Sequence, residues 1–207
     1  ARASLHLDDK VLTSWNGLTI AALAFLYRVT GEELYLHAAQ RGREFINTHL
    51  RRGTSLFAGF RAGKKGAPGF LDDYAFYTAA LLALYDATGE HTLLEEAEDL
   101  CRETIRQFED RQKGGFFLSG KNHEALLFNP KDYADTALPS GNSVMALNLT
   151  RLSQITGKEE WTHAAEEQLK NFAGQAKEYP MGYSLYLLAL LLHQNPPPHI
   201  TVVLGPE

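Results

Sequence analysis

Charged residues occur along the chain in alternating blocks, which indicates helices of two kinds. Four segments contain no Asp, Glu, Lys or Arg: residues 15–27, 74–85, 137–150 and 179–192. Three charged segments alternate with them and carry apolar residues at helical spacing: residues 32–51, 90–111 and 159–177. A helix without charge can be covered on every side, whereas an amphipathic helix keeps one face in water. The pattern therefore predicts about seven helices, in which uncharged inner helices alternate with charged outer helices.

A short motif ending in Thr-Gly separates each of the first three uncharged segments from the charged segment that follows it. The three copies end at Gly31, Gly89 and Gly157. Glycine suits this position because the residue that ends a helix often adopts a left-handed conformation, which a Cβ disfavours. The copies are 58 and 68 residues apart. This spacing excludes a tetratricopeptide array, which repeats every ~34 residues.

The lengths of the connections predict how the helices are arranged. Short turns join each inner helix to the next outer helix, and long segments at about residues 51–71 and 112–136 return to the next inner helix. All inner helices then run in one direction, and the long returns lie at one end. We therefore predict an all-α fold, a partial α/α toroid with short β-hairpin-like returns. Residues 200–203 are strand-like and predict a terminal strand.

Length and charge restrict the class of protein further. The 207 residues suit a single domain, residues 1–207. A net charge of −5 argues against a nucleic-acid partner, and no apolar run reaches the roughly 18 residues of a membrane span. Because no signal peptide is visible, we expect a cytoplasmic protein. Seven helices are too few to close a ring, so we expect either that an upstream part of the same protein is missing or that another chain completes the ring.

Candidate chemistry collects where the inner helices are predicted to begin. Helix N-termini present free N–H groups and the positive end of the helix dipole. Polar and aromatic residues occur at each predicted start: Asp8, Asp9, Trp15 and Asn16 at the first, Asp72, Asp73 and Tyr74 at the second, Asp135, Ser140 and Asn142 at the third, and Tyr183 at the fourth. Carboxylates and amides bind sugar hydroxyls, and aromatic rings stack on the C–H face of a pyranose. The predicted rim is therefore typical of a saccharide site.

Each of these residues also has a purely structural interpretation. Asp72 or Asp73 can cap the helix that follows, and Asp8 and Asp9 can form a surface turn with Lys10. The segment 139–142 reads as a helix start with its own cap. Only the coincidence of these residues at one predicted rim favours a functional site over capping.

Several other kinds of site are excluded by the absence of their motifs. The chain has no glycine-rich phosphate loop and no His-Glu-x-x-His motif, and Cys101 is its only cysteine. We therefore expect no metal and no cofactor in this chain. Histidines are almost absent from the predicted inner wall, which leaves an epimerase without the bases it would need.

Three blocks in a fixed order carry a family resemblance. They are Asp8-Asp9-Lys10 through Trp15-Asn16-Gly17, then Leu71-Asp72-Asp73-Tyr74, then Pro139-Ser140-Gly141-Asn142. Together they resemble the C-terminal part of the YyaL-like family of thioredoxin-domain-containing proteins, the spermatogenesis-associated protein 20-like group. The resemblance implies a thioredoxin-like domain followed by a six-hairpin glycosidase-like α/α toroid. This chain would lack the thioredoxin-like domain and the early hairpins.

Two hypotheses about function follow. The first is a sugar-binding or sugar-processing domain, glycosidase- or epimerase-like if it is an enzyme, in which Asp73 and Asp9 are the catalytic carboxylates. Its ligand is a small molecule, a saccharide, and its expected substrate-binding residues are Trp15, Asn16, Asp72, Tyr74, Asp135, Ser140, Asn142 and Tyr183. The second is a non-catalytic module that binds a client or ligand for a thioredoxin-like domain elsewhere in the full-length protein.

Overall fold

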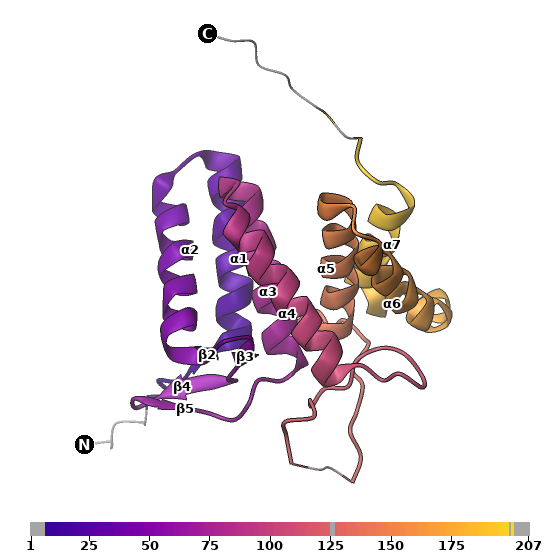
Figure 1. Cartoon of the computed structure of the whole chain (residues 1–207), viewed down its shortest axis with the longest axis horizontal. Coiled ribbons are helices and arrows are strands. Elements are labelled where there is room, and N and C mark those ends of the chain that lie inside the picture. Colours follow the sequence, from indigo (N-terminus) through magenta and orange to yellow (C-terminus); the bar gives the residue numbers. More distant parts are fainter. Residues whose placement is uncertain (1–6, 125–126, 199, 201–207) are drawn as a thin grey trace, which may run out of the picture.

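Four inner and three outer α-helices make up the part of the chain that the computed structural model describes, residues 7–124, 127–198 and 200 (Figure 1). The inner helices are α1 (Thr13–Thr30), α3 (Leu71–Thr88), α5 (Gly141–Thr156) and α7 (Ser184–Gln194). The outer helices are α2 (Glu33–Phe45), α4 (His91–Phe108) and α6 (Glu159–Glu178). The alternation predicted from the distribution of charge is confirmed.

The inner helices form one continuous row. Helix α1 packs against α3, α3 against α5, and α5 against α7, while α2, α4 and α6 each pack on the inner helix that precedes them. Figure 1 shows the long returns at one end of the helices and the short turns at the other. The prediction of a partial α/α toroid is therefore confirmed.

The three Thr-Gly motifs end the inner helices as predicted. Gly31, Gly89 and Gly157 have φ angles of 73°, 70° and 65°, and each donates its N–H to the carbonyl oxygen of the residue four positions earlier. This left-handed turn reverses the chain within a few residues. The outer helix therefore packs directly against its inner partner.

The first return is built from short antiparallel strands. Strands β2 (Arg51–Arg52) and β3 (Ser55–Leu56) form one hairpin, and β4 (Gly59–Arg61) pairs with both β1 (Val11–Leu12) and β5 (Lys64–Lys65). A π-helical turn, Ile46–Leu50, leads into this return, and a 3₁₀ turn, Pro180–Tyr183, precedes α7. In the described part of the second return, strand pairing is limited to the bridge from Glu109 to Phe116. The terminal strand predicted at residues 200–203 lies, apart from Ile200, outside the described residues.

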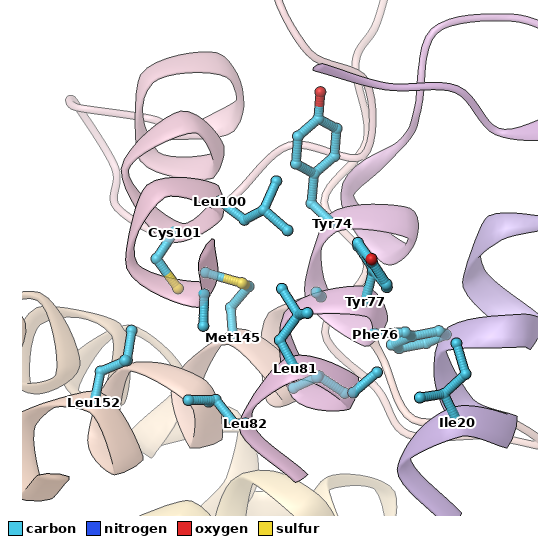
Figure 2. Packing of buried hydrophobic residues seen from close by; sticks show 14 of the residues in the cluster. Ile20, Tyr74, Phe76, Tyr77, Leu81, Leu82, Leu100, Cys101, Met145 and Leu152 are labelled. Atoms are coloured by element: carbon cyan, nitrogen blue, oxygen red, sulfur yellow. The ribbon is translucent and has the colours of Figure 1, made fainter. Parts of the chain in front are cut away.

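Helix α3 is the centre of the hydrophobic core. Figure 2 shows its residues Phe76, Leu81 and Leu82 among side chains from α1, α4 and α5, including Met145 and Cys101. Cys101 is completely buried, and burial raises the pKa of its thiol. Within the described residues, no helix has both the length and the apolar character needed to cross a membrane. An uncharged helix enclosed on all sides, with charged helices outside it, is what the sequence pattern predicts.

The row of inner helices depends on close backbone contact. A Cβ added to Gly17 of α1 would lie 2.8 Å from the carbonyl carbon of Phe76 and 2.9 Å from the backbone nitrogen of Tyr77. Both of these neighbours are backbone atoms of α3, so a side-chain rotation cannot relieve the overlap. Glycine at this position therefore sets how closely α1 approaches α3.

We expect Gly17→Ala to destabilise the protein by about 1–3 kcal/mol, because the added methyl group forces two packed helices apart. Gly174→Ala is a matched control, since Gly174 lies in α6 and an added Cβ meets no atom within 4 Å. That substitution should be neutral or stabilising by up to about 1 kcal/mol, because alanine favours helix. Urea denaturation followed by circular dichroism measures both changes, and equal effects would contradict the close-approach argument.

Candidate functional site

The rim at which the inner helices begin brings together most of the residues that the sequence singles out. Asp73 is the most enclosed carboxylate among them, with 3% of its surface exposed. Its Oδ1 atom accepts a hydrogen bond from the backbone N–H of Ser14 at 2.9 Å, and its Oδ2 atom accepts one from Phe70 at 2.9 Å. Burial raises the pKa of Asp73 to about 7, although both N–H groups favour the charged form. Asp73 therefore caps the starts of α1 and α3 together.

Asp9, the second predicted catalytic carboxylate, lies in a different environment. It is exposed and forms an ion pair with Arg61 on β4, with 2.6 Å between Oδ1 and Nε. Its neighbour Asp8 pairs with Lys10 at 3.3 Å. Asp9 and Asp73 thus have separate partners, and the structure does not join them as an acid–base pair.

Asp135 and Ser140 hold the starts of α5 and α7. Asp135 accepts hydrogen bonds from the backbone N–H groups of Ser140 at 3.0 Å and of Leu185 at 2.8 Å. Ser140 is the N-cap of α5, because its Oγ atom accepts from the N–H of Ser143 at 3.1 Å. The helix start and cap predicted at residues 139–142 are confirmed. Asp135, like Asp73, uses both carboxylate oxygens to join neighbouring helix starts.

Three residues expected to bind a sugar form hydrogen bonds within the protein, and two of them, Asn142 and Tyr74, hold the returns. Asn142 is completely buried, and its side-chain amide donates to the carbonyl oxygens of Phe116 at 2.9 Å and Asp132 at 2.8 Å. The buried Tyr74 accepts through its hydroxyl oxygen from the N–H of Leu56 at 3.0 Å. Asn16 donates to the carbonyl oxygen of Leu12 at 2.8 Å. These contacts occupy the groups that would otherwise face a ligand.

Asp72 is more accessible than Asp73, and the charge of a second carboxylate acts on it. It is half-buried and lies beside Gly141, where an added Cβ would be only 2.5 Å from its Oδ1 atom. Burial, and then the nearby negative charge of Asp132, raise the pKa of Asp72. A carboxyl group whose pKa is raised in this way is suited to donate a proton.

The charge of Asp132 acts on both Asp72 and Tyr183. Burial first, and then the charges of Asp132 and Asp135, raise the pKa of the Tyr183 hydroxyl. Asp132 itself is exposed, and its backbone is held by the amide of Asn142. The sequence pattern did not single out Asp132 as a site residue. The feature that could have indicated it is its position beside Tyr133, in a long return that ends at the rim.

The rim around Asp72, Asp132 and Tyr183 is accessible to a ligand. Trp15 at the start of α1 has 60% of its surface exposed, so its ring is free to stack on a ligand. A cavity of about 410 Å³ lies at the rim between residues 135–139, which precede α5, and the start of α7, and its lining includes Asp135, Pro139 and Leu185. A larger cavity of about 660 Å³ lies on the outer side, between α4, α6 and residues 109–116. Among the described residues, no three His, Cys, Asp or Glu side chains are grouped to hold a metal ion.

Comparison with known proteins relates the chain to proteins of much greater length. No protein-family model matches it. It is 33% identical over 217 aligned residues to spermatogenesis-associated protein 20 of Rattus norvegicus, and 34% identical over 205 residues to that of Homo sapiens. The chain is homologous to spermatogenesis-associated protein 20. The two alignments cover 100% and 94% of the chain but 28% and 26% of these relatives, so the chain spans about a quarter of their length.

The chain is also similar to solved structures of sugar-processing enzymes that are α/α toroids. Cellobiose 2-epimerase from Spirochaeta thermophila matches 79% of the chain and 43% of its own length, with a TM-score of 0.65 and 18% identity. An α-mannanase from Bacteroides thetaiotaomicron matches 93% of the chain and 55% of its own, with a TM-score of 0.67 and 13% identity. An inactive α-1,6-mannanase from Salegentibacter, with two consecutive aspartates changed to asparagine and α-1,6-mannotriose bound, matches 78% and 46%, with a TM-score of 0.61 and 16% identity. At these identities the likeness establishes the fold alone.

The buried position of Asp73 leads to a prediction about stability and pH. Because its pKa is about 7 in the folded protein and near 3.8 when unfolded, the folded state holds a proton that the unfolded state has lost between these values. Stability should therefore fall as pH rises from about 4 to about 7, by up to ~1.4 kcal/mol per pH unit. Asp73→Asn should reduce this slope and also lose one cap. Urea denaturation at pH 5 and pH 8 tests this; parallel curves for the two proteins would contradict it.

Proposed function

We propose that the rim formed by α1, α3, α5 and α7 is one side of a saccharide site, in which Asp72 donates a proton and Asp132 is the second carboxylate. The observation that carries the proposal is the position of Asp72: half-buried at the start of an inner helix, against Gly141 of the next inner helix, where the charge of Asp132 acts on it. Proton transfer to a glycosidic oxygen requires a protonated acid that faces another carboxylate. This pair now stands in place of Asp73 and Asp9 as the favoured catalytic carboxylates.

The environment of the pair supports a sugar as the ligand. Trp15 offers an exposed ring at the same rim, and the hydroxyl of Tyr183 is close to the charge of Asp132. Structural neighbours of the same fold act on cellobiose or bind α-1,6-mannotriose. One neighbour was made inactive by changing two consecutive aspartates, and Asp72-Asp73 is such a pair at the start of an inner helix. The fold of the structural neighbours and the residues at the rim both support a saccharide as the ligand.

A non-catalytic binding module is the alternative, and a specific observation favours it. Both carboxylate oxygens of Asp73 and of Asp135 accept hydrogen bonds from N–H groups at helix starts, and Asp9 is held in an ion pair. Most of the acidic groups at the rim therefore already have a structural task. Under this alternative, the full-length protein binds a ligand or client at the rim for use by another domain, and Asp72 has no role in turnover.

We expect Asp72→Asn to lower turnover of a saccharide by about 100-fold or more, because the amide cannot supply the proton. Binding should change little, since the side chain keeps its size and its contact with Gly141. The measurement is a screen of the full-length protein against cellobiose and α-1,6-manno-oligosaccharides, with binding and product formation followed separately. Asp99→Asn, on the exposed face of α4, is the matched control. Binding without turnover by the unchanged protein would favour the alternative.

The interaction between Asp72 and Asp132 predicts a shift in the pH dependence of turnover. A general acid must be protonated, so turnover falls as pH rises through the pKa of Asp72. Asp132→Asn should lower turnover at every pH, because the second carboxylate is lost, and it also removes a charge that raises the pKa of Asp72. The fall in the remaining turnover should therefore move to lower pH. Asp8→Asn removes an equal charge from an exposed turn and should leave the profile unchanged. Turnover of the unchanged protein and of both variants is measured across the pH range. If the Asp132→Asn profile has the same pH dependence as that of the unchanged protein, the proposed interaction between Asp72 and Asp132 is contradicted.

A further inference from the structure

Positive charge is concentrated in the first return. Residues 51–71 contain no Asp or Glu but five cationic residues: Arg51, Arg52, Arg61, Lys64 and Lys65. The whole chain has a net charge of −5, so this segment is opposite in sign to the remainder. A surface that only keeps a protein in solution mixes charges of both signs. A segment with one sign of charge is therefore a candidate for binding a group of the opposite charge.

Two of the five cations have acidic partners. Arg51 pairs with Glu96 of α4 at 2.6 Å, and Arg61 pairs with Asp9 at 2.6 Å. Among the described residues, the other three form no ion pair with a carboxylate, and all three are exposed. We call these three the return cations: Arg52, Lys64 and Lys65.

Two of the return cations are held at the same aromatic ring. The guanidinium carbon of Arg52 lies 5.9 Å from the centroid of the Phe57 ring, and Nζ of Lys65 lies 4.8 Å from it. Lys65 Nζ also donates a hydrogen bond to the carbonyl oxygen of Arg51 at 3.1 Å, which fixes the ammonium group. The face of the ring attracts each cation, but the two cations repel each other. An anion bound at this point would reduce the repulsion.

Strand pairing brings the third return cation beside another positive charge. Strands β4 and β5 pair so that Lys64 stands directly opposite Arg61, and like charges at opposite positions of a strand pair are destabilising. Strand β5 is the edge of its sheet, where lysines protect against pairing with another chain. Edge protection explains the lysines of β5, but it does not explain Arg52, which lies on the other hairpin and contacts the same ring as Lys65.

The return cations lie next to the start of α1. Thr13, the first residue of this helix, donates through Oγ1 to the carbonyl oxygen of Phe57 at 2.6 Å and through its N–H to that of Ala58 at 3.1 Å. Strand β1, which leads into α1, pairs with β4. Figure 1 shows both hairpins at the end of the molecule where the long returns lie. The return cations therefore border the rim on the side of α1.

We propose that the return cations Arg52, Lys64 and Lys65 bind an anionic group of a ligand: a carboxylate, a sulfate or a phosphate. Guanidinium and ammonium groups hold such groups through charge-assisted hydrogen bonds, which are stronger than those between neutral groups. Combined with the proposed function, on which this step rests, the site makes the substrate an acidic saccharide rather than a neutral one. The return cations recognise the substrate and take no part in proton transfer.

Binding measurements on the full-length protein test the proposal without requiring turnover. Isothermal titration calorimetry at constant ionic strength compares three probes: cellobiose, the same disaccharide with glucuronic acid as its non-reducing sugar, and inorganic phosphate. The acidic disaccharide should bind about 10-fold or more tightly than cellobiose, because it adds hydrogen bonds to charged groups. The double substitution Arg52→Gln and Lys65→Gln should abolish this difference. Lys170→Gln, which removes an exposed cation of outer helix α6, is the matched control and should preserve it.

The outcomes separate the anion site from the proposed function. Both substituted side chains are exposed, and circular dichroism verifies that the double variant is folded. Equal binding of the two disaccharides, or anion binding that survives the double substitution, would overturn the anion site and leave the saccharide site standing. Phosphate binding that requires Arg52 and Lys65, without affinity for either disaccharide, would confirm the anion site and contradict the saccharide function. Absence of binding by both anionic probes would overturn the anion site.

Discussion

Close contact between uncharged inner helices is the constraint on which the rest of this structure depends. At Gly17 the backbone of α1 lies directly against that of α3, and Asn148 of α5 donates a hydrogen bond to the carbonyl oxygen of Ala75 in α3 at 2.8 Å. A charged side chain in this space would lose its water without gaining an ion pair, which costs several kcal/mol. Charges on the inner row are therefore found at the helix ends, where Asp86 pairs with Arg28 and Arg151.

Parallel packing of the inner helices determines the chemistry of the rim. Since the helices start at the same end, their unpaired N–H groups and positive dipole ends are concentrated there and need acceptors. Asp73 and Asp135 meet this need, and each serves two helices at once. The rim would therefore be acidic even in a toroid without any catalytic activity. Acidic residues at this end do not by themselves indicate a catalytic site.

This ambiguity explains why the fold could be predicted from the sequence more fully than the site. The alternation of charge and the glycines at the ends of the inner helices are local signals, and they sufficed to predict the row of helices. The role of Asp73 depends on its contact with Ser14, which is 59 residues away in the sequence. The position of Asp132 depends on the buried amide of Asn142. Neither contact can be predicted from the neighbouring residues in the sequence. A carboxylate that caps a helix and a carboxylate that acts as a catalytic acid therefore look the same in the local sequence.

The pair Asp72-Asp73 shows how the two roles can be separated by position. Consecutive residues of a helix point about 100° apart, so two adjacent carboxylates at a helix start cannot both face inward. Asp73 accepts hydrogen bonds from the N–H groups of Ser14 and Phe70, whereas Asp72 lies against Gly141 of α5 and is acted on by the charge of Asp132. Loss of activity after a change at Asp73 would not identify it as catalytic, because the starts of α1 and α3 would be disturbed as well. A double substitution of adjacent aspartates, as in the inactive mannanase, likewise does not distinguish a proton donor from a helix cap. Only a single substitution that leaves both helix starts intact can make this distinction.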